Sequence, residues 1–429
     1  MQYMEISNFG PIKHCAIDIG GDAGGINILT GPQASGKSTI AKAVYFFRTV
    51  VEELTGNLLM QYAWNQERFS VDSFKRRLNS KFVELFGDIG KTSSDLSLVY
   101  HYEKGDAGAF MEIRPHAMHH LGENPLVSFR FGAEIVSLLE ELRSADVQTV
   151  HATPGWLEEV REKCAAIFRC DCDTVFIPAG RSAATLLSER FPYLLSSFEE
   201  WQRKAIDYCT RMFVEMTLDL RSWFSSIHVQ RMHVEPVIEL QRLASRTLGA
   251  TYKYEDNEER LYFADNGNEN FVKMQYASSG QQEAVWVFNT LVHFLSESTK
   301  IFLIIEEPEA HLYPESQMHI TDALALFAAH GNPVMITTHS PYVLGELNNL
   351  ILCGQVPPAK QEQVKEIINQ HSWIAPGAYN AAHIEGGICE NNNAISESGL
   401  IMNELIDGVS EIINQRCDRL LDVLEGEGA

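Results

Sequence analysis

Hydrophobic and polar positions alternate along the first part of the chain in the way that β-strands require. Apolar side chains recur at short intervals through Met1–Thr30, around a turn at Gly10-Pro11, and the segment closes with the apolar run Ile26–Thr30. Alternation with a period of two indicates half-buried strands, and a short apolar run indicates a buried strand. We therefore predict a hairpin of short strands followed by a buried strand.

A helical pattern comes next. From Ser38 to about Leu59 the apolar side chains recur every three to four residues, which is the spacing of a helix with one buried face. The residues between the strand and this helix are small and polar, with two glycines. The pattern thus predicts a strand, a glycine-rich turn and a helix in immediate succession.

Strands and helices alternate again in the second half of the chain. The predicted elements are a strand at Val175–Pro178, a helix from Gln281, a strand at Ile301–Ile305, a helix from Pro314 and a strand at Val334–Thr337. This order is typical of a mainly parallel sheet. Upstream of the first of these helices, Asp265-Asn266-Gly267 is a hairpin turn signal between two aromatic-rich segments.

Together these patterns predict an α/β protein with a mixed or parallel sheet and three regions. Residues 1–59 and 173–350 form a discontinuous head, which includes a helical arm at about 195–247. Residues 60–172, where short helical and alternating segments mix, form an inserted helical and β lobe. Residues 351–429 form a C-terminal helical region that ends in an amphipathic helix at Ile395–Leu424.

Composition limits the function. The 429 residues, 45% of them hydrophobic, are enough for a large core, which excludes a small disulfide scaffold and a disordered tail. A net charge of −23 excludes general coating of nucleic acids, so DNA would be approached only through a local basic patch. The 8 cysteines are scattered, and no apolar run is long enough to span a membrane. We therefore expect a cytoplasmic protein with reduced thiols and no membrane partner.

The strongest motif lies in the glycine-rich turn. Gly31-Pro32-Gln33-Ala34-Ser35-Gly36-Lys37-Ser38-Thr39 fits the pattern G-x-x-x-x-G-K-[ST] between a predicted strand and a predicted helix. In this motif the glycines let backbone N–H groups converge on phosphate oxygens at a helix N-terminus. Lys37 would neutralise the outer phosphates, and the Ser38 hydroxyl would bind Mg²⁺. We call residues 31–39 the phosphate loop.

An acidic pair follows the most apolar strand. Glu306 and Glu307 come directly after Ile301–Ile305, and the carboxyl ends of strands are where α/β sheets bind ligands. Glu306 is suited to hold Mg²⁺, directly or through water, and Glu307 to orient or deprotonate an attacking water. The alternative is that these residues simply begin a solvated loop.

Two further motifs are ambiguous by themselves. Ser278-Ser279-Gly280-Gln281, which we call the signature loop, precedes an apolar helix, so Ser279 could cap that helix, or the loop could bind a phosphate supplied from elsewhere. His339 follows the predicted strand at Val334–Thr337, where an imidazole could contact a phosphate or an attacking water. A purely structural histidine is the alternative.

The order of these four motifs resembles the ABC-type ATPase head, with its phosphate loop, signature loop, acidic pair and switch histidine. The continuations Glu306–Pro314 and Thr338–Leu344 resemble the branch that includes overcoming-lysogenization-defect nucleases, SMC-like and break-repair heads, and bacterial antiphage ATPases. The matching segments are 1–59, 175–188 and 252–350, so the lobe and the C-terminal region are not covered.

The resemblance implies that two heads meet head to tail around ATP and Mg²⁺. Ser279, Gly280 and Gln281 of one head would then close on ATP held by the phosphate loop of the other, with Glu307 and His339 as the catalytic residues. Two departures bear on turnover. Glu306 stands where the family usually has Asp, and Ser279 replaces the first of two glycines, so we expect slow hydrolysis with ATP acting mainly as a structural ligand.

Other residues are open to more than one interpretation. Arg181 resembles an arginine near the head interface, where it would contact phosphate or a partner acid in trans or form a surface salt bridge. The cysteines and histidines of the lobe form either a zinc site or reduced structural thiols, and the basic residues of the arm form either a DNA-contacting or a solvated face. The first set is Cys164, Cys170, Cys172, His116, His119 and His120, and the second is Arg203, Lys204, Arg211, Arg221, Arg231, Arg242 and Arg246.

From these observations we expect an ATPase that assembles as a homo-oligomer, a dimer or a multiple of dimers. By resemblance to the ATPases of the Septu, PARIS and retron systems, it would act as sensor and scaffold for a separate toxic effector such as a nuclease in antiphage defence. No nuclease motif is apparent in this chain. The apolar face of the last helix would pack on the head or form an oligomer contact. The alternatives are a DNA-repair or chromosome-maintenance clamp of the SMC-like type and, less well supported, a transporter subunit.

Overall fold

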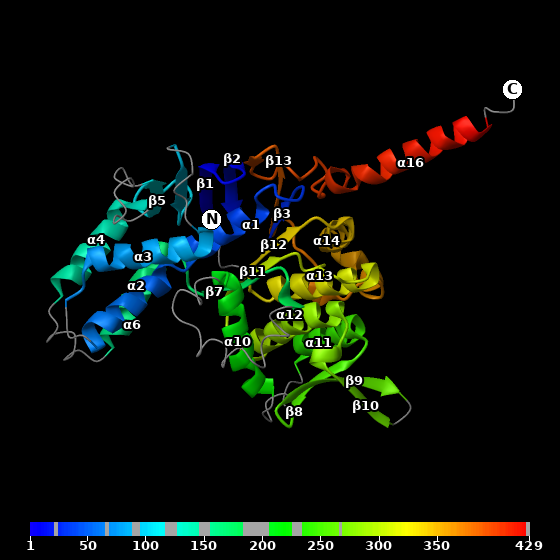
Figure 1. The fold of residues 1–429 in the computed structure, drawn as a ribbon, viewed down its shortest axis with the longest axis horizontal. Helices are drawn as coiled ribbons and strands as arrows, with labels where there is room; N and C mark the ends of the chain where they lie inside the picture. Colours follow the sequence, from blue (N-terminus) through cyan, green and yellow to red (C-terminus); the bar gives the residue numbers. More distant parts are fainter. Residues whose placement is uncertain are drawn as a thin grey trace.

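The computed structural model describes residues 1–20, 25–64, 68–87, 95–115, 127–145, 155–182, 206–224, 234–265 and 268–425. Within these residues one sheet of 11 strands, in the order β6-β5-β4-β1-β2-β14-β13-β3-β12-β11-β7, forms the centre of a mixed α/β fold. A second sheet, in the order β10-β9-β8, lies at the opposite end of the molecule from β1 and β2 (Figure 1). The α/β class and the mixed sheet are as predicted.

The predicted parallel sheet is present. Its strands are β3 (Ile26–Thr30), β12 (Val334–Thr338), β11 (Ile301–Glu306) and β7 (Asp173–Ile177), each parallel to the next. Side chains of β11 alternate between two hydrophobic cores, one on each face of the sheet. Phe302 and Ile304 lie in one core, and Ile301, Leu303 and Ile305 lie in the other. Because both faces are covered, these strands read as continuous apolar runs in the sequence.

Helices cover both faces of this parallel part (Figure 1). They are α1 (Lys37–Arg48), α10 (Tyr208–Phe224), α12 (Ser279–Ser296), α13 (Pro314–Ala329) and α14 (Pro341–Gly354). Helix α2 (Val50–Leu59) continues the chain away from these strands, and α11 (Glu235–Leu248) packs on α12 and α13. The prediction of one helix from Ser38 to Leu59 is wrong at Thr49, which separates α1 from α2. The Thr49 hydroxyl donates to the carbonyl oxygens of Tyr45 and Phe46, and such back-bonding bends helices.

The region predicted as an inserted lobe extends the same sheet. Strands β1 (Gln2–Phe9) and β2 (Ile12–Ile19) form the predicted hairpin, and β1 pairs on its other edge with β4 (Ser97–His101). Strands β5 (Phe110–Pro115) and β6 (Val127–Phe131) continue it. The helices of this region are α3 (Val71–Phe86), α4 (Ala133–Ser144), α6 (Trp156–Phe168) and a π-helical turn at Met60–Trp64.

The C-terminal region is not entirely helical, which corrects the prediction for 351–429. Strands β13 (Tyr379–Glu385) and β14 (Ile388–Glu390) insert between β3 and β2, joined by a turn at Gly386-Gly387. Buried Ala381 and Ile384 contribute to the cores on the two faces of the sheet. The segment between α14 and β13 holds short helical turns: 3₁₀ helices at Pro358–Lys360 and Gln370–Ser372 and α15 (Gln361–Lys365).

The last helix begins later than predicted. Helix α16 spans Glu404–Glu425, not Ile395–Leu424, and extends away from the body of the protein (Figure 1). Its apolar residues Leu405, Ile412, Ile413, Leu420 and Leu421 are exposed, whereas Ile401, just before it, is buried. The side chains of Val409 and Val423 lie outside the described part. Of the two predicted roles, packing on the head is therefore not seen for the described side chains of this helix.

The strands on either side of the predicted turn at 265–267 pair with each other, and residues 266 and 267 lie outside the described part. Strand β9 (Glu258–Asp265) pairs with β10 (Asn268–Lys273), with Asp265 opposite Asn268, and also with β8 (Thr251–Glu255). A 3₁₀ turn at Met274–Tyr276 leads from β10 toward α12. The predicted arm at 195–247 corresponds to α10 and α11, and residues 195–205 and 225–233 lie outside the described part. Among the described residues, no helix is both long and apolar enough to cross a membrane.

The small sheet is joined to α10 by a buried ion pair between Arg221 and Glu259. Replacing Arg221 with Met should lower the free energy of unfolding by about 3–5 kcal/mol, because it leaves the Glu259 carboxylate buried without its cation. Replacing Lys163, whose ion pair with Glu141 is exposed, with Met should leave stability nearly unchanged. Urea unfolding followed by circular dichroism measures both. Equal effects of the two substitutions would contradict this account.

Candidate functional site

The phosphate loop connects the end of β3 to the start of α1, and its two glycines are required by close contacts. Gly31 and Gly36 have φ angles of 149° and 112°, which other residues rarely adopt. A Cβ atom at Gly36 would lie 2.8 Å from Cγ1 of Ile12, and one at Gly31 would lie 2.7 Å from the carbonyl oxygen of Ile384. The loop is therefore fitted closely against β1–β2 and β13.

Lys37 begins α1 directly after this loop. Its ammonium group donates to the carbonyl oxygens of Gly31 and Pro32, at 2.7 and 2.8 Å, so it bends back over the loop. Burial lowers the pKa of Lys37, and the nearby charges of Glu307 and Glu309 partly oppose this. The N-cap residue Gly36 offers no side-chain acceptor, so the first backbone N–H groups of α1 remain available to an anion.

The loop lines a cavity of about 750 Å³ that also holds residues from distant parts of the sequence. Its walls are Pro11, Gln33, Ala34, Ser35, Gly36, Lys37, Ser38, Thr39, Glu307 and His339. The structure thus brings together most of the predicted phosphate loop and both predicted catalytic residues. Pro11, in the β1–β2 turn, was not predicted as a site residue. It lines the cavity because the β1–β2 turn lies next to the phosphate loop.

Glu307 is the first residue after β11, and its backbone is strained. Its φ angle is 43°, an uncommon value for a residue with a side chain. Its backbone N–H donates to Thr337 at 2.9 Å, which ties it to β12. Its side chain is 38% exposed and lies toward the cavity, with Oε1 at 3.5 Å from Nδ1 of His339. A partly exposed carboxylate at this position can contact a water molecule in the cavity.

Glu306, the last residue of β11, is buried and does not line the cavity. It is 6% exposed, and Oε2 accepts from the backbone N–H of Ala179 at 3.3 Å. Among the described residues, Oε1 has no hydrogen-bond partner although it is buried. A buried carboxylate oxygen without a donor fits a cation or its bound water. Together with the Ser38 hydroxyl, Glu306 therefore has the donor chemistry that Mg²⁺ prefers.

Arg181 does not take either of its predicted roles. It is fully buried, and its guanidinium donates to the carbonyl oxygens of Pro178, Glu306 and Glu307, at 2.9, 2.7 and 3.0 Å. It also pairs with Glu283 of α12, which is 1% exposed. Burial lowers the pKa of Arg181. In this arrangement Arg181 fastens the ends of β7 and β11 together, so both the trans contact and the surface salt bridge are wrong.

Glu283 was missed by the sequence analysis. Its two carboxylate oxygens accept the backbone N–H groups of Arg181 and Ser182 at 3.0 and 2.9 Å. The available signal was a charged residue inside the apolar run of the helix after the signature loop. Buried charges are rare unless paired, so this residue could have been predicted to have an arginine partner, though not which one.

The signature loop forms the N-terminus of α12. Ser278, and not Ser279 as predicted, is the N-cap and forms a capping box with Gln281, so the cap lies one residue earlier than predicted. A Cβ atom at Gly280 would lie 2.7 Å from the carbonyl oxygen of His311, which shows that this turn packs against the turn after β11. Ser278 and Ser279 are exposed. None of the four residues, all described, lines the phosphate-loop cavity.

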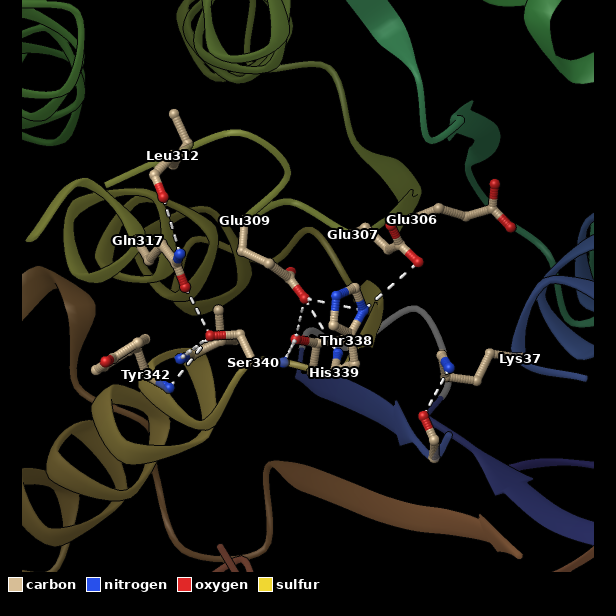
Figure 2. Close-up of polar contacts among 12 residues, drawn as sticks. Lys37, Glu306, Glu307, Glu309, Leu312, Gln317, Thr338, His339, Ser340 and Tyr342 are labelled. Carbon is tan, nitrogen blue, oxygen red and sulfur yellow. Dashed lines mark hydrogen bonds and ion pairs between the residues drawn. The ribbon is translucent and has the colours of Figure 1, made fainter. Parts of the chain in front are cut away.

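The loop of His339 is held by two polar residues that the sequence analysis gave no role. Glu309, 5% exposed, accepts from the Thr338 hydroxyl at 2.6 Å and from the His339 backbone N–H at 3.1 Å. Gln317 of α13 accepts from the Ser340 hydroxyl at 2.6 Å. Figure 2 shows His339 between Glu309 and Glu307, with contacts to both. The sequence signal was a third glutamate close after the acidic pair.

The lobe cysteines have polar partners within the protein. Cys170 accepts from the side-chain amide of Gln2 at 3.6 Å, and Cys172 from Arg48 at 3.7 Å. Cys164 is fully buried, and burial raises its pKa to about 12. These contacts favour the structural-thiol interpretation. The histidines of the zinc interpretation, at 116, 119 and 120, lie outside the described residues.

Several basic residues of the arm are engaged by carboxylates. Arg211 pairs with Glu84, Arg221 with Glu259 and Arg242 with Glu239. Arg242 and Arg246 line a second cavity, of about 600 Å³, together with Lys365, Glu235, Glu366 and His371. Residues 203, 204 and 231 are not described. The arm thus presents one mixed-charge cavity, not a uniformly basic face, in the part that the structure describes.

Comparisons with known proteins give a partial family match. Residues 221–344 match the model of a family described as AAA ATPase domain. This segment includes the signature loop, the acidic pair Glu306–Glu307 and His339, and it begins long after the phosphate loop. No curated protein matches the chain.

Among solved structures, the chain is similar to SMC head domains. One is the Smc head domain with an extended coiled coil bound to the C-terminal domain of ScpA from Pyrococcus furiosus, at 10% identity and a TM-score of 0.42, covering 96% of this chain and 100% of that chain. Another is the SMC head domain from Thermotoga maritima, at 9% identity and a TM-score of 0.35, covering 91% and 97%. Residues 221–344 are thus similar to an ATPase domain, and the described part of the chain has a mixed α/β P-loop fold.

Proposed function

We propose that the chain is an ATP-binding, slowly hydrolysing ABC-type ATPase that forms head-to-tail dimers or multiples of them. The observation that carries this proposal is the single cavity shared by the phosphate loop, Glu307 and His339. Phosphoryl transfer needs a cradle for the phosphates, a group that orients water and a group that contacts the outer phosphate. These residues have the chemistry for each task, on three elements that end at the same edge of the sheet.

In the proposed reaction the α1 N-terminus and Lys37 bind the phosphates of ATP, and Glu307 orients the attacking water. His339 contacts the γ-phosphate. Ser38 and Glu306 would hold Mg²⁺, which supplies charge neutralisation at the phosphates when it is bound. Glu306 is buried, whereas Glu307 is partly exposed in the cavity, so the two carboxylates have different environments and different tasks.

Dimerisation is proposed from the position of the signature loop. In one chain this loop is outside the phosphate-loop cavity, yet it offers an exposed helix N-terminus with two serine hydroxyls. An exposed helix N-terminus is suited to a phosphate. A second copy that presents Ser279 and Gly280 to ATP would complete the site, and ATP would then hold the dimer together.

For the biological role we propose a sensor and scaffold that restrains or positions a separate toxic effector, such as a nuclease, in antiphage defence. This rests on the resemblance of Glu306–Pro314 and Thr338–Leu344 to antiphage ATPases. The net charge of −23 favours a basic effector or trigger. The exposed apolar face of α16 offers surface for a further protein contact.

A DNA clamp of the SMC-like type is the second candidate. The mixed-charge cavity lined by Arg242, Arg246 and Lys365 favours it, because phosphate contacts by Arg and Lys dominate DNA affinity. The net charge and the paired state of Arg242 disfavour it.

Replacing Lys37 with Ala should weaken ATP binding at least a hundredfold, because it removes the cation that faces the phosphates and leaves their charge uncompensated. Isothermal titration calorimetry with ATP and Mg²⁺ measures this. The exposed Lys163→Ala variant serves as the control and should bind as the wild type does. Unchanged affinity in Lys37→Ala would exclude the phosphate loop as the ATP site.

Replacing Glu307 with Gln should keep ATP affinity within a few-fold and lower kcat by at least a hundredfold, so that ATP accumulates in a trapped dimer. Light scattering with ATP measures the mass. Adding Ser279→Arg to this variant should restore the monomer while each chain still binds ATP, because only the partner's site is blocked. A trapped dimer that survives Ser279→Arg would contradict the head-to-tail arrangement.

The biological role is tested by recovering tagged Glu307→Gln protein from its native host with ATP and Mg²⁺ and identifying what accompanies it. A stoichiometric nuclease or toxin is expected. An oligomer that carries only DNA would support the clamp instead.

A further inference from the structure

His339 sits on a loop that is fastened to a buried carboxylate. Glu309 lies in the turn after β11, and one of its oxygens, Oε1, accepts from both the Thr338 hydroxyl and the His339 backbone N–H. A carboxylate that receives two donors from consecutive residues fixes the backbone of the loop that carries them. The position of His339 at the end of β12 is therefore set in part by Glu309.

The same carboxylate also faces the imidazole ring. Oε1 of Glu309 lies 3.8 Å from Nδ1 of His339, and Oε1 of Glu307 lies 3.5 Å from the same nitrogen, on the other side of the ring (Figure 2). Both separations are longer than a hydrogen bond, and such contacts often shorten when a substrate binds. Because two acceptors face Nδ1, the proton is favoured there, and Nε2 is left as the acceptor nitrogen.

The second oxygen of Glu309 is an unused acceptor. Glu309 is 5% exposed, and its Oε2 is buried without a hydrogen-bond partner among the described residues. Burying an acceptor in this way costs stability, and an apolar residue could fill the same space. The retained charge therefore calls for a role beyond fastening Thr338, and the His339 imidazole lies 3.8 Å from the other oxygen of Glu309.

We propose that Glu309 is a positioning residue for ATP hydrolysis, which keeps the His339 ring oriented with Nδ1 toward the two carboxylates. The inference rests on the proposed ATPase function. Glu309 does not line the cavity, so it acts through His339 and does not touch ATP. Its effect is therefore on turnover and not on ATP affinity.

A neighbouring residue gives a matched control. Gln317 fastens the same loop through the Ser340 hydroxyl and also donates to the Leu312 carbonyl oxygen at 2.9 Å (Figure 2). Gln317 is uncharged and bonds to Ser340, not to the imidazole. Replacing it with Met loosens the loop without altering the charge beside the ring, so it reports what loosening alone does.

Turnover is tested with a double-mutant cycle. Glu309→Gln keeps an oxygen for Thr338 and the His339 N–H but removes the charge, and it should lower kcat about tenfold with ATP affinity unchanged. In a His339→Ala background the same substitution should have no further effect. Gln317→Met should have the same small effect in both backgrounds. If Glu309→Gln lowers kcat equally in both backgrounds, Glu309 acts only through the fold and the proposal is overturned.

A second measurement needs no hydrolysis. In ¹⁵N-histidine-labelled protein, the imidazole signals of His339, assigned by their loss in His339→Ala, should indicate a proton on Nδ1 in the wild type. In Glu309→Gln they should shift toward the Nε2-protonated form, and in Gln317→Met they should not. Unchanged signals in Glu309→Gln would overturn the proposal even if ATP is hydrolysed. If His339→Ala is fully active but the expected shifts are seen, the catalytic role of His339 would be refuted. Glu309 would then still orient the ring, but this orientation would not affect turnover.

Discussion

The parallel alignment of β3, β12 and β11 is the constraint on which the site depends. Thr338 is paired with Thr30, and Glu306 with Thr337, so the three strands end at the same edge of the sheet. The phosphate loop, the acidic pair and the His339 loop therefore begin side by side although they lie far apart in sequence. A register shift of one residue would move each side chain to the other face, so the cavity requires this register.

Many charged side chains lie at that edge, and hydrogen bonds to the backbone stabilise them. Arg181 donates to the carbonyl oxygens at the ends of β7 and β11, and Glu283 accepts the backbone N–H of Arg181. Breaking such a buried pair leaves an uncompensated charge, so the strand ends are held firmly. The strained backbone of Glu307 sits between Arg181 and β12. A fixed backbone at this point keeps the Glu307 carboxylate in the cavity without a tight contact of its own.

The sequence predicted best where one segment contains all the information. Local spacing and turn chemistry predict the phosphate loop, the buried strand at 301–305 and a hairpin around 265–267. The structure has the loop between a strand and a helix, the buried strand, and paired strands on either side of the turn. The sequence predicted worst where a residue's role depends on a distant partner. Arg181 was predicted to make an interface or surface contact because Glu283 is remote in sequence. Strands β13 and β14 fell in a region predicted as helical because the strands with which they pair, β3 and β2, are distant in the chain. The break between α1 and α2 occurs at Thr49, whose hydroxyl donates to backbone carbonyl oxygens of α1. The spacing of apolar residues carries no information about such a bond.

The sequence by itself determined the α/β class, the phosphate loop and the residue types available for phosphate chemistry, because periodicity and glycine positions act over a few residues. Only the tertiary structure decided that Glu307 and His339 share the cavity with Lys37, that Glu306 is buried outside its lining, and that Arg181 and Glu309 are buried supports. The physical reason is that burial and the pairing of charges arise between strands and helices distant in the chain. Packing likewise decided the position of the α12 N-terminus, which Ser278 caps and which lies outside the cavity of its own chain.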